Sequence, residues 1–327
     1  SSSKSGSPRP RACCPTRGMV CCSDAVRGLL GKRQQRACCP EGSVKHAAFT
    51  DYEPKGYTWY MGGRGLKAYI TGASANDSWH GKPVIIMVHD IFGPNAGRHY
   101  QLADSWAKEL RGVVIVPDYF HGESVLAEDP GPLGPRFIIK VVWAVIRGKL
   151  SGFCKRFPSA DLLADTQVIR NFLVGRNVIR FGMVGFCWGA FAIFKEAGLA
   201  NPPLPTLVCC ASFHPSVEGV AKELGEEWEE IVRQAVASGC AQMVIATSME
   251  PKEWQPEGTA HKMLVAGLPF SAGEVPRVSF TATAQPHGYM TRGNLDKPDV
   301  KAAVDKGVHD VTDFFRPRLK RQAGDPE

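Results

Sequence analysis

The chain has 327 residues, of which 44% are hydrophobic and 22% are charged, proportions that are ordinary for a globular protein. No stretch approaches the roughly 18 consecutive apolar residues that cross a bilayer, so no membrane span is expected. The net charge of +7 resides in residues 1–49, which hold nine of the 39 basic and two of the 32 acidic residues. The remainder is neutral, so we expect no nucleic-acid partner for the folded part.

Residues 1–42 are expected to form a basic, Cys-rich arm that is separate from the rest. The arm is rich in Ser, Arg, Pro and Cys, and its motif Arg-Ala-Cys-Cys-Pro occurs at 11–15 and again at 36–40. Its six cysteines are adjacent pairs, which lack the spacing of zinc sites and rarely bridge each other. The composition is typical of organelle transit peptides and also of disordered arms, and both interpretations stay open.

The cysteine pattern bears on the compartment. Eleven cysteines, an odd number without regular spacing, argue against a secreted disulfide framework. We therefore expect a reducing, intracellular compartment, either the cytosol or an organelle such as the mitochondrion or plastid.

Strand and helix patterns alternate over the remaining residues, 43–327, which we expect to form one domain. β-Branched runs such as 83–89 have the composition of strands covered on both faces, whereas the spacing at 100–110 is helical. The predicted strands are 57–60, 66–71, 83–89, 112–117, 180–185, 207–213, 242–247 and 277–284. The predicted helices are 100–110, 138–146, 160–173, 190–198, 223–238 and 300–315, and 123–152 is expected to supply lid loops.

This alternation predicts an α/β fold with a doubly wound, mostly parallel sheet flanked by helices. In such sheets, functional groups gather beyond the carboxyl ends of the strands. Six chemically active residues directly follow predicted strands: Asp90, Asp118, Cys187, His214, Glu250 and His287. The sequence therefore predicts a functional site at this edge of the sheet.

The most specific motif is Gly-Phe-Cys-Trp-Gly at 185–189, between a predicted strand and a predicted helix. This is the context of the nucleophile elbow of α/β-hydrolases, with Cys187 in place of the commoner serine. Glycines two positions away leave room for a tight turn, and the helix N-terminus favours a thiolate. The amide of Trp188 points to where an oxyanion would form. The alternative is a small buried cysteine at a strand end.

A cysteine nucleophile needs a base, and the α/β-hydrolase order of nucleophile, acid and histidine favours His287 after the last strand over its competitor His214. The acid should follow the next-to-last strand, which points to Glu250. Glu253 and Glu257 lie in the same loop and are its rivals. The alternative is that all three glutamates are solvated loop charges.

Four segments together resemble the dienelactone hydrolase (carboxymethylenebutenolidase) family. They are Gly-Phe-Cys-Trp-Gly at 185–189, Val-His-Asp-Ile-Phe-Gly at 88–93, Pro-Asp-Tyr-Phe-His-Gly at 117–122 and His-Gly-Tyr-Met-Thr-Arg-Gly at 287–293. The resemblance covers roughly residues 38–315. It implies a single-domain α/β-hydrolase with a Cys-Asp-His triad that opens lactones and cleaves related esters.

By the same resemblance, Cys187 matches the nucleophile and His287 the base. Asp90 matches a carboxylate that modulates the resting thiol, and Ile91 supplies the second oxyanion amide beside Trp188. Arg292 resembles an arginine that binds the substrate carboxylate. The chain departs from the family in two places, because Glu250 is one methylene longer than the family's acid and Asp90 is one shorter than the bacterial glutamate.

The leading hypothesis is hydrolysis of a small lactone or ester by a cysteine nucleophile, with no metal and no organic cofactor. The altered acid and the unusual arm motivate a rival from another class, a catalytically impaired family member that serves as an interaction or scaffold subunit. The N-terminal arm would then mediate the assembly. A third hypothesis is a redox-sensitive protein that uses the paired cysteines.

Overall fold

The computed structural model describes residues 52–126, 131–135, 137–139, 148–199, 204–269 and 275–320. The chain divides into two compact units, Ser1–Glu41 and Gly42–Glu327, and all described residues belong to the second. The predicted arm over 1–42 and most of the predicted helix over 138–146 lie outside the described residues. Among the described helices, none is long and apolar enough to span a bilayer.

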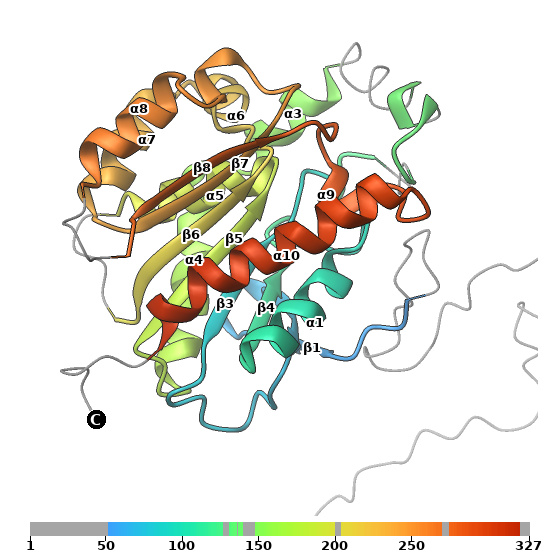
Figure 1. Cartoon of the computed structure of the whole chain (residues 1–327). Coiled ribbons are helices and arrows are strands. Elements are labelled where there is room, and N and C mark those ends of the chain that lie inside the picture. Colours follow the sequence, from blue (N-terminus) through green and yellow to red (C-terminus); the bar gives the residue numbers. More distant parts are fainter. Residues whose placement is uncertain are drawn as a thin grey trace, which may run out of the picture. The chain divides into compact units, whose positions relative to one another are not determined.

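Eight strands form one sheet in the order β1-β2-β4-β3-β5-β6-β7-β8 (Figure 1). The hairpin of β1 and β2 is antiparallel, β2 pairs antiparallel with β4, and each pairing from β4 through β8 is parallel. The strands are β1 Tyr57–Tyr60, β2 Lys67–Thr71, β3 Val84–Val88, β4 Val113–Pro117, β5 Arg180–Phe186, β6 Thr206–Phe213, β7 Ala241–Thr247 and β8 Val278–Thr283. The predicted fold class is confirmed.

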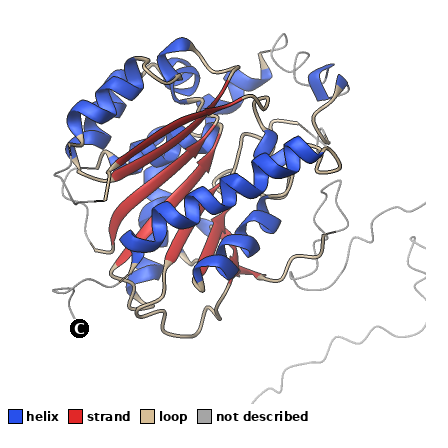
Figure 2. Ribbon diagram, viewed as in Figure 1, coloured by secondary structure: helices blue, strands red, loops and turns tan. Residues whose placement is uncertain are grey.

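Helices cover both faces of the twisted sheet (Figures 1 and 2). On one face, α1 (His99–Leu110) packs on α10 (Pro298–Leu319), and both contact the strands. On the other face, α5 (Trp188–Ala197) is the central helix. The helical segments with bounds in the described part of the chain further include η1 Gly63–Gly65, α3 Lys149–Arg156, α4 Ser159–Val174, α6 Val217–Leu224, α7 Trp228–Ala237, η2 Lys252–Trp254, α8 Thr259–Gly267 and α9 Tyr289–Arg292.

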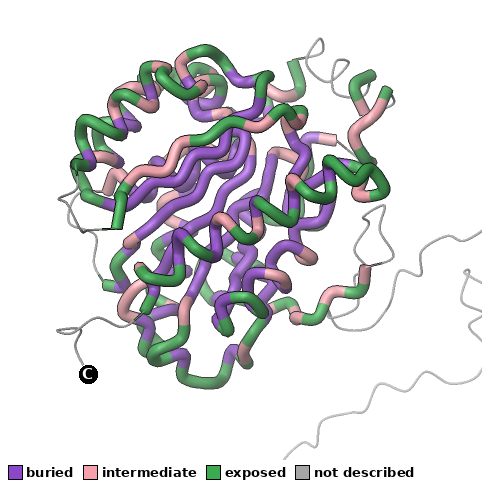
Figure 3. The backbone as a smooth tube through the Cα atoms, in the orientation of Figure 1, coloured by how far each residue is buried: buried purple, intermediate pink, exposed green. Residues whose placement is uncertain are grey.

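The uninterrupted apolar strands follow from this layering. Ile86 and Val88 of β3 belong to the core beneath α4 and α5, whereas Ile85 and Met87 belong to the core beneath α1 and α10. Successive side chains of a strand point to opposite faces, so a strand covered twice must be apolar at every position. The central strands are accordingly buried along their length (Figure 3).

The prediction of a single helix over 223–238 is wrong. Gly225 ends α6 in a left-handed conformation with φ 72°, and its amide donates to the carbonyl of Lys222. Glycine adopts this conformation without the steric cost that a Cβ brings, which makes it a common residue at helix C-termini. The chain then restarts as α7. The acidic residue Glu226 between the two helices accepts from Lys195 Nζ at 2.8 Å, so it is more than a solvated charge.

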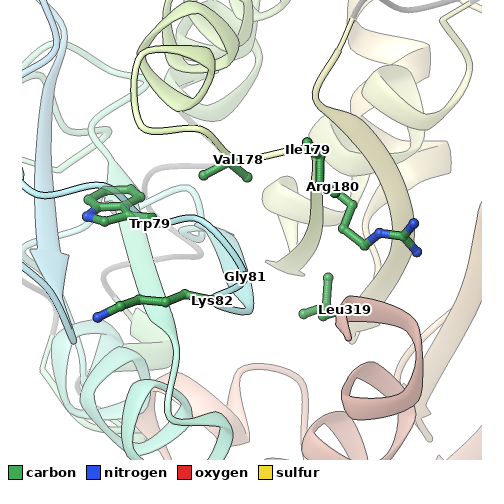
Figure 4. A pocket seen from close by; sticks show the side chains of 7 residues that line it. All are labelled: Trp79, Gly81, Lys82, Val178, Ile179, Arg180 and Leu319. Carbon is green, nitrogen blue, oxygen red and sulfur yellow. The ribbon is translucent and has the colours of Figure 1, made fainter. Parts of the chain in front are cut away.

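A small hollow lies at the amino ends of β3 and β5 (Figure 4). It is lined by Trp79, Gly81, Lys82, Val178, Ile179, Arg180 and Leu319, and its volume is about 10 Å³. One water needs about 10–15 Å³. This hollow is therefore too small to hold a substrate.

Candidate active site

The carboxyl ends of the parallel strands carry the six residues that the sequence singled out. Asp118 stabilises the turn that follows β4, because its carboxylate accepts hydrogen bonds from the amides of Phe120 at 3.2 Å and Gly122 at 2.7 Å. Burial raises the pKa of this carboxyl above its ordinary value. Asp118 therefore shapes the loop after β4.

The predicted elbow is a strained turn between β5 and α5. Cys187 has φ 53° and ψ −111°, a conformation that is unfavourable for a residue with a side chain. A Cβ on Gly185 would lie 2.4 Å from the carbonyl oxygen of Gly189, and a Cβ on Gly189 would lie 2.5 Å from that of Val88. Both glycines are therefore required by backbone contact, and the turn holds the thiol at the edge of the sheet.

His287 and Glu250 are hydrogen-bonded. His287 Nδ1 lies 2.6 Å from Glu250 Oε1, with the glutamate side chain 1% and the histidine side chain 31% exposed. The other carboxylate oxygen of Glu250 accepts from the amide of Thr247 at the end of β7. The rival Glu257 lies 3.7 Å from His261 instead, and no contact of the rival Glu253 with His287 occurs in the described part of the chain.

His287 also interacts electrostatically with Cys187. Burial by itself lowers the pKa of His287, but the facing thiolate of Cys187 and the carboxylate of Glu250 outweigh it and raise this pKa to about 10. At neutral pH His287 therefore carries its proton. An imidazolium beside a thiol favours the ionised form that acts as a nucleophile.

Sequence reasoning missed Ser216 as a neighbour of the thiol. Its Oγ lies 3.3 Å from Cys187 Sγ, and its amide donates to the carbonyl of Cys187 at 3.1 Å. Ser216 stands three residues beyond β6, the same spacing as Glu250 beyond β7. It was passed over because His214 already represented the chemistry after that strand, and no motif marks this serine.

The two amides predicted for the oxyanion hole are available. Trp188 is the first residue of α5, where a helix leaves its amides without internal partners. Within the described ranges, neither this amide nor that of Ile91 donates a hydrogen bond. The neighbouring amides are occupied, since Phe92 donates to Asp90 Oδ1 at 3.0 Å and Gly93 to the Asp90 carbonyl at 3.1 Å.

Asp90 is buried beside Arg292 and not against the thiol. Its Oδ2 lies 3.5 Å from Arg292 Nε and accepts from Thr291 Oγ1 at 3.0 Å. Burial would raise the pKa of Asp90, but Arg292 and His99 outweigh it and hold the pKa below its ordinary value. Asp90 is therefore the ionised partner of Arg292. In the described structure, it makes no contact with Cys187.

Arg292 is fully buried as well. Its Nη1 donates to the carbonyl of Gly131 at 3.1 Å, and its guanidinium lies 4.5 Å from the ring centre of Phe92. A substrate carboxylate that binds Arg292 would have to compete with Asp90.

The loop that carries Asp90 is tied to the segment that carries His287. The amide of Arg98 donates to the Thr291 carbonyl at 2.9 Å, and its Nη1 donates to the Met290 carbonyl at 3.1 Å. A Cβ on Gly97 would lie 2.5 Å from the Thr291 oxygen, so the two backbones are in direct contact. The predicted base and the predicted oxyanion loop are therefore positioned together.

His214, the competitor for the role of base, packs beside His287. Their ring centres are 4.6 Å apart, and neither ring nitrogen of the buried His214 has a hydrogen-bond partner in the described structure. Burial, together with the nearby charge of His287, holds the pKa of His214 well below its ordinary value. His214 is therefore neutral, and no acid orients it.

Fold and site together define an α/β-hydrolase. The model of the dienelactone hydrolase family matches residues 66–238, which include the elbow and the loops after β3 and β4. The match spans more than half of the chain, and the protein belongs to the dienelactone hydrolase family, whose members are hydrolases of esters and lactones. No match was found among curated protein sequences.

Several solved structures are similar in fold. TT1662 from Thermus thermophilus is 13% identical, with 83% of this chain and 100% of that chain covered and a TM-score of 0.45. The esterase Est2 from Thermogutta terrifontis is 11% identical, with coverages of 83% and 96% and a TM-score of 0.49. Brefeldin A esterase, a bacterial homologue of human hormone sensitive lipase, is 12% identical, with coverages of 85% and 81% and a TM-score of 0.48. Such distant likenesses carry no argument about the activity of this chain.

Proposed function

We propose that the protein hydrolyses small esters or lactones with Cys187 as nucleophile, His287 as base and Glu250 as the acid that orients the histidine. One observation carries this proposal. The thiol on the strained elbow interacts electrostatically with His287, whose Nδ1 lies 2.6 Å from the buried carboxylate of Glu250. Family membership supports the ester and lactone class of substrate.

The proposed mechanism uses a thiolate nucleophile and a protonated histidine. The Cys187 thiolate attacks the carbonyl carbon, and the oxyanion receives hydrogen bonds from the amides of Trp188 and Ile91. The His287 imidazolium gives its proton to the leaving oxygen, and the carbon–oxygen bond breaks to leave a thioester. His287 then takes a proton from water, whose oxygen attacks the thioester, and the acid product departs as the thiolate re-forms.

Glu250 stabilises the imidazolium and fixes the ring, as the acid of a triad does. Its longer side chain folds back onto the end of its own strand, where Thr247 donates to it. This contact offers a physical reason for a glutamate to replace the family's aspartate. We further propose that Arg292 binds a carboxylate of the substrate, which then displaces Asp90. The role of Asp90 in modulating the thiol stays a prediction.

The test is turnover of a panel of small lactones and aryl esters by wild type and Cys187→Ser. We expect kcat/KM to fall by about 10³-fold or more, because the hydroxyl is far less ionised than the thiol. Cys240→Ser is the control. It makes the same atom change at a buried thiol that directly precedes β7, and it should retain wild-type turnover.

Equal turnover by Cys187→Ser and wild type would refute the cysteine nucleophile. Absence of turnover by a folded wild type across the panel would favour the scaffold hypothesis instead.

A further inference from the structure

A larger hollow lies at the carboxyl end of β4. Its volume is about 190 Å³, and its wall includes Trp188, the residue that follows Cys187. This is far more than the about 10–15 Å³ that one water needs, but below the roughly 300–1,000 Å³ of pockets for drug-sized ligands. The size suits a ligand of about one ring.

The polar side of this hollow is built around a buried carboxylate. Asp165, with its side chain 2% exposed, accepts from Arg64 Nε at 2.7 Å, and its other oxygen lies 2.7 Å from His121 Nε2. His121 has a left-handed backbone with φ 51° and a side chain that is 32% exposed. Since Nε2 is engaged, Nδ1 is the ring nitrogen left for a ligand, and the described structure shows no partner for it. The network is preformed in the free protein.

The charges around the hollow nearly cancel. Arg64 also pairs with Asp161 at 2.8 Å, and Arg156 pairs with Glu123 at 3.0 Å. Two guanidinium groups face three carboxylates, so the wall carries one net negative charge when His121 is neutral and none when it is protonated. Such a wall has no surplus positive charge for an anion. Its mixture of donors and acceptors instead matches hydroxyl groups, each of which both donates and accepts.

The apolar side is aromatic. Tyr119, Phe157 and Trp188 line the hollow, and the hydroxyl of Tyr119 is already engaged with Thr166 Oγ1 at 3.2 Å. Apolar walls with a few fixed polar groups are typical of small-molecule sites. An uncharged ring with hydroxyls at its edge and C–H groups on its face matches both sides of this hollow.

We propose that this hollow binds a hydroxyl-rich, uncharged ring, a monosaccharide unit or a close analogue, and that the substrates are carboxylic esters of such alcohols. The second half rests on the proposed function. Trp188 lines the hollow and directly follows Cys187 in the chain, so we expect the ester carbonyl of the bound alcohol to extend from the hollow toward Cys187. In the first step, sulfur bonds to the acyl carbon, the ester C–O bond breaks, and the proton of His287 passes to the released sugar oxygen.

Binding is tested first, without catalysis, on the full chain with Cys187→Ala. Methyl glucoside is titrated by calorimetry and ligand-observed NMR, with malonate as the anionic probe. We expect saturable binding of methyl glucoside with a Kd of about 1 mM, weak as befits a small ligand, and none of malonate. His121→Asn, which tolerates the left-handed backbone, should weaken binding about tenfold.

The matched control is His309→Asn, which removes a surface histidine 3.1 Å from Asp313 on α10 and should bind like the parent. No saturable binding of methyl glucoside, tighter binding of malonate, or equal effects of the two histidine variants would overturn the site.

The substrate class is tested next with the wild type, on a mono-acetyl ester of methyl glucoside and on ethyl acetate. We expect kcat/KM to be at least about tenfold higher for the sugar ester. If aryl esters are hydrolysed but the sugar ester has no advantage, the substrate class is wrong while the proposed function stands. If no ester of any kind is hydrolysed, the proposed function and the substrate class both fail, and the binding result decides the site by itself.

Discussion

The amino and carboxyl ends of the parallel strands differ in which residues adopt a positive φ angle. Of the seven described non-glycine residues with positive φ, Arg111 and Asn177 stand shortly before β4 and β5, and Arg111 caps the end of α1. His121, Cys187 and His214 stand shortly after β4, β5 and β6. Each such conformation costs about 1–3 kcal/mol. At the amino end it belongs to the turns that lead into the strands, whereas at the carboxyl end it positions residues of the predicted site and the hollow beside it.

The hollows at the two ends of the strands differ in volume and in the polar groups that line them. The amino end has about 10 Å³ beside Leu319, whereas the carboxyl end has about 190 Å³ around a preformed network of charges. The carboxyl end also buries polar groups that a stable core would avoid, such as the unpartnered ring of His214. Stability and chemistry are therefore divided between opposite edges of one sheet, and this division can be tested.

The largest effect is expected for Glu250→Gln at the carboxyl end. The glutamine keeps the shape but removes the charge that stabilises the His287 imidazolium, so kcat/KM should fall by about 10³-fold. Glu250 also helps to raise the pKa of His287 from 6.5 to about 10. The basic limb of the pH–rate profile should therefore move to lower pH in the variant.

The raised pKa of His287 also makes the stability of the fold depend on pH. Because the folded-state pKa of His287 lies above its ordinary 6.5, its stabilising contribution is fully present below pH 6.5 and is lost as the pH rises through about 10. Thermal melts across this window should show a smaller loss for Glu250→Gln than for wild type. An unchanged rate profile and an unchanged pH dependence would remove Glu250 from the site.

A smaller effect is expected for Ser216→Ala, which removes the hydroxyl 3.3 Å from the thiol. One neutral hydrogen bond corresponds to roughly 0.5–1.5 kcal/mol, so kcat/KM should fall by about fivefold. Ser105→Ala on α1, whose hydroxyl donates to the Gln101 carbonyl at 2.9 Å, is the matched control. A loss equal to that of Cys187→Ser would instead make Ser216 a participant in the chemistry.

The smallest effect on activity is expected at the amino end. Leu319→Ala truncates a side chain that is 3% exposed and should destabilise the fold by about 2–3 kcal/mol, as measured by urea unfolding. Turnover per folded molecule should stay within about twofold of wild type. A selective loss of turnover would show that the two ends are coupled and would break the contrast.

The sequence predicted most of the fold because strands buried on both faces leave a local signal. The runs at β3 and β4 are apolar at every position, which only a doubly covered sheet requires. The break between α6 and α7 was missed because one glycine within an amphipathic pattern looks tolerable. Its φ of 72° is a property of the chain around it. The helices α3 and α8 were missed as well: α3 begins within the expected lid segment 123–152, and no element was predicted over 259–267.

The predicted site residues came from their position after strands, a local property. The contacts that these residues make could not be predicted from the sequence. Asp90, for example, contacts Thr291 and Arg292, which lie 201 and 202 residues further along the chain. Nothing in either local pattern encodes that contact. The same holds for Ser216, whose contact with the thiol depends on how the loop after β6 returns beneath the elbow.

The junction between the Arg98 loop and the Thr291 segment has a mechanical consequence. Because Arg98 donates from both its backbone and its side chain to this segment, we expect the loop that carries Ile91 and the segment that carries His287 to move together. The predicted base and the predicted oxyanion amide of Ile91 then keep their mutual spacing, whereas the amide of Trp188 moves with the elbow. We expect heating to disrupt this alignment abruptly, when the hydrogen bonds between the two segments break.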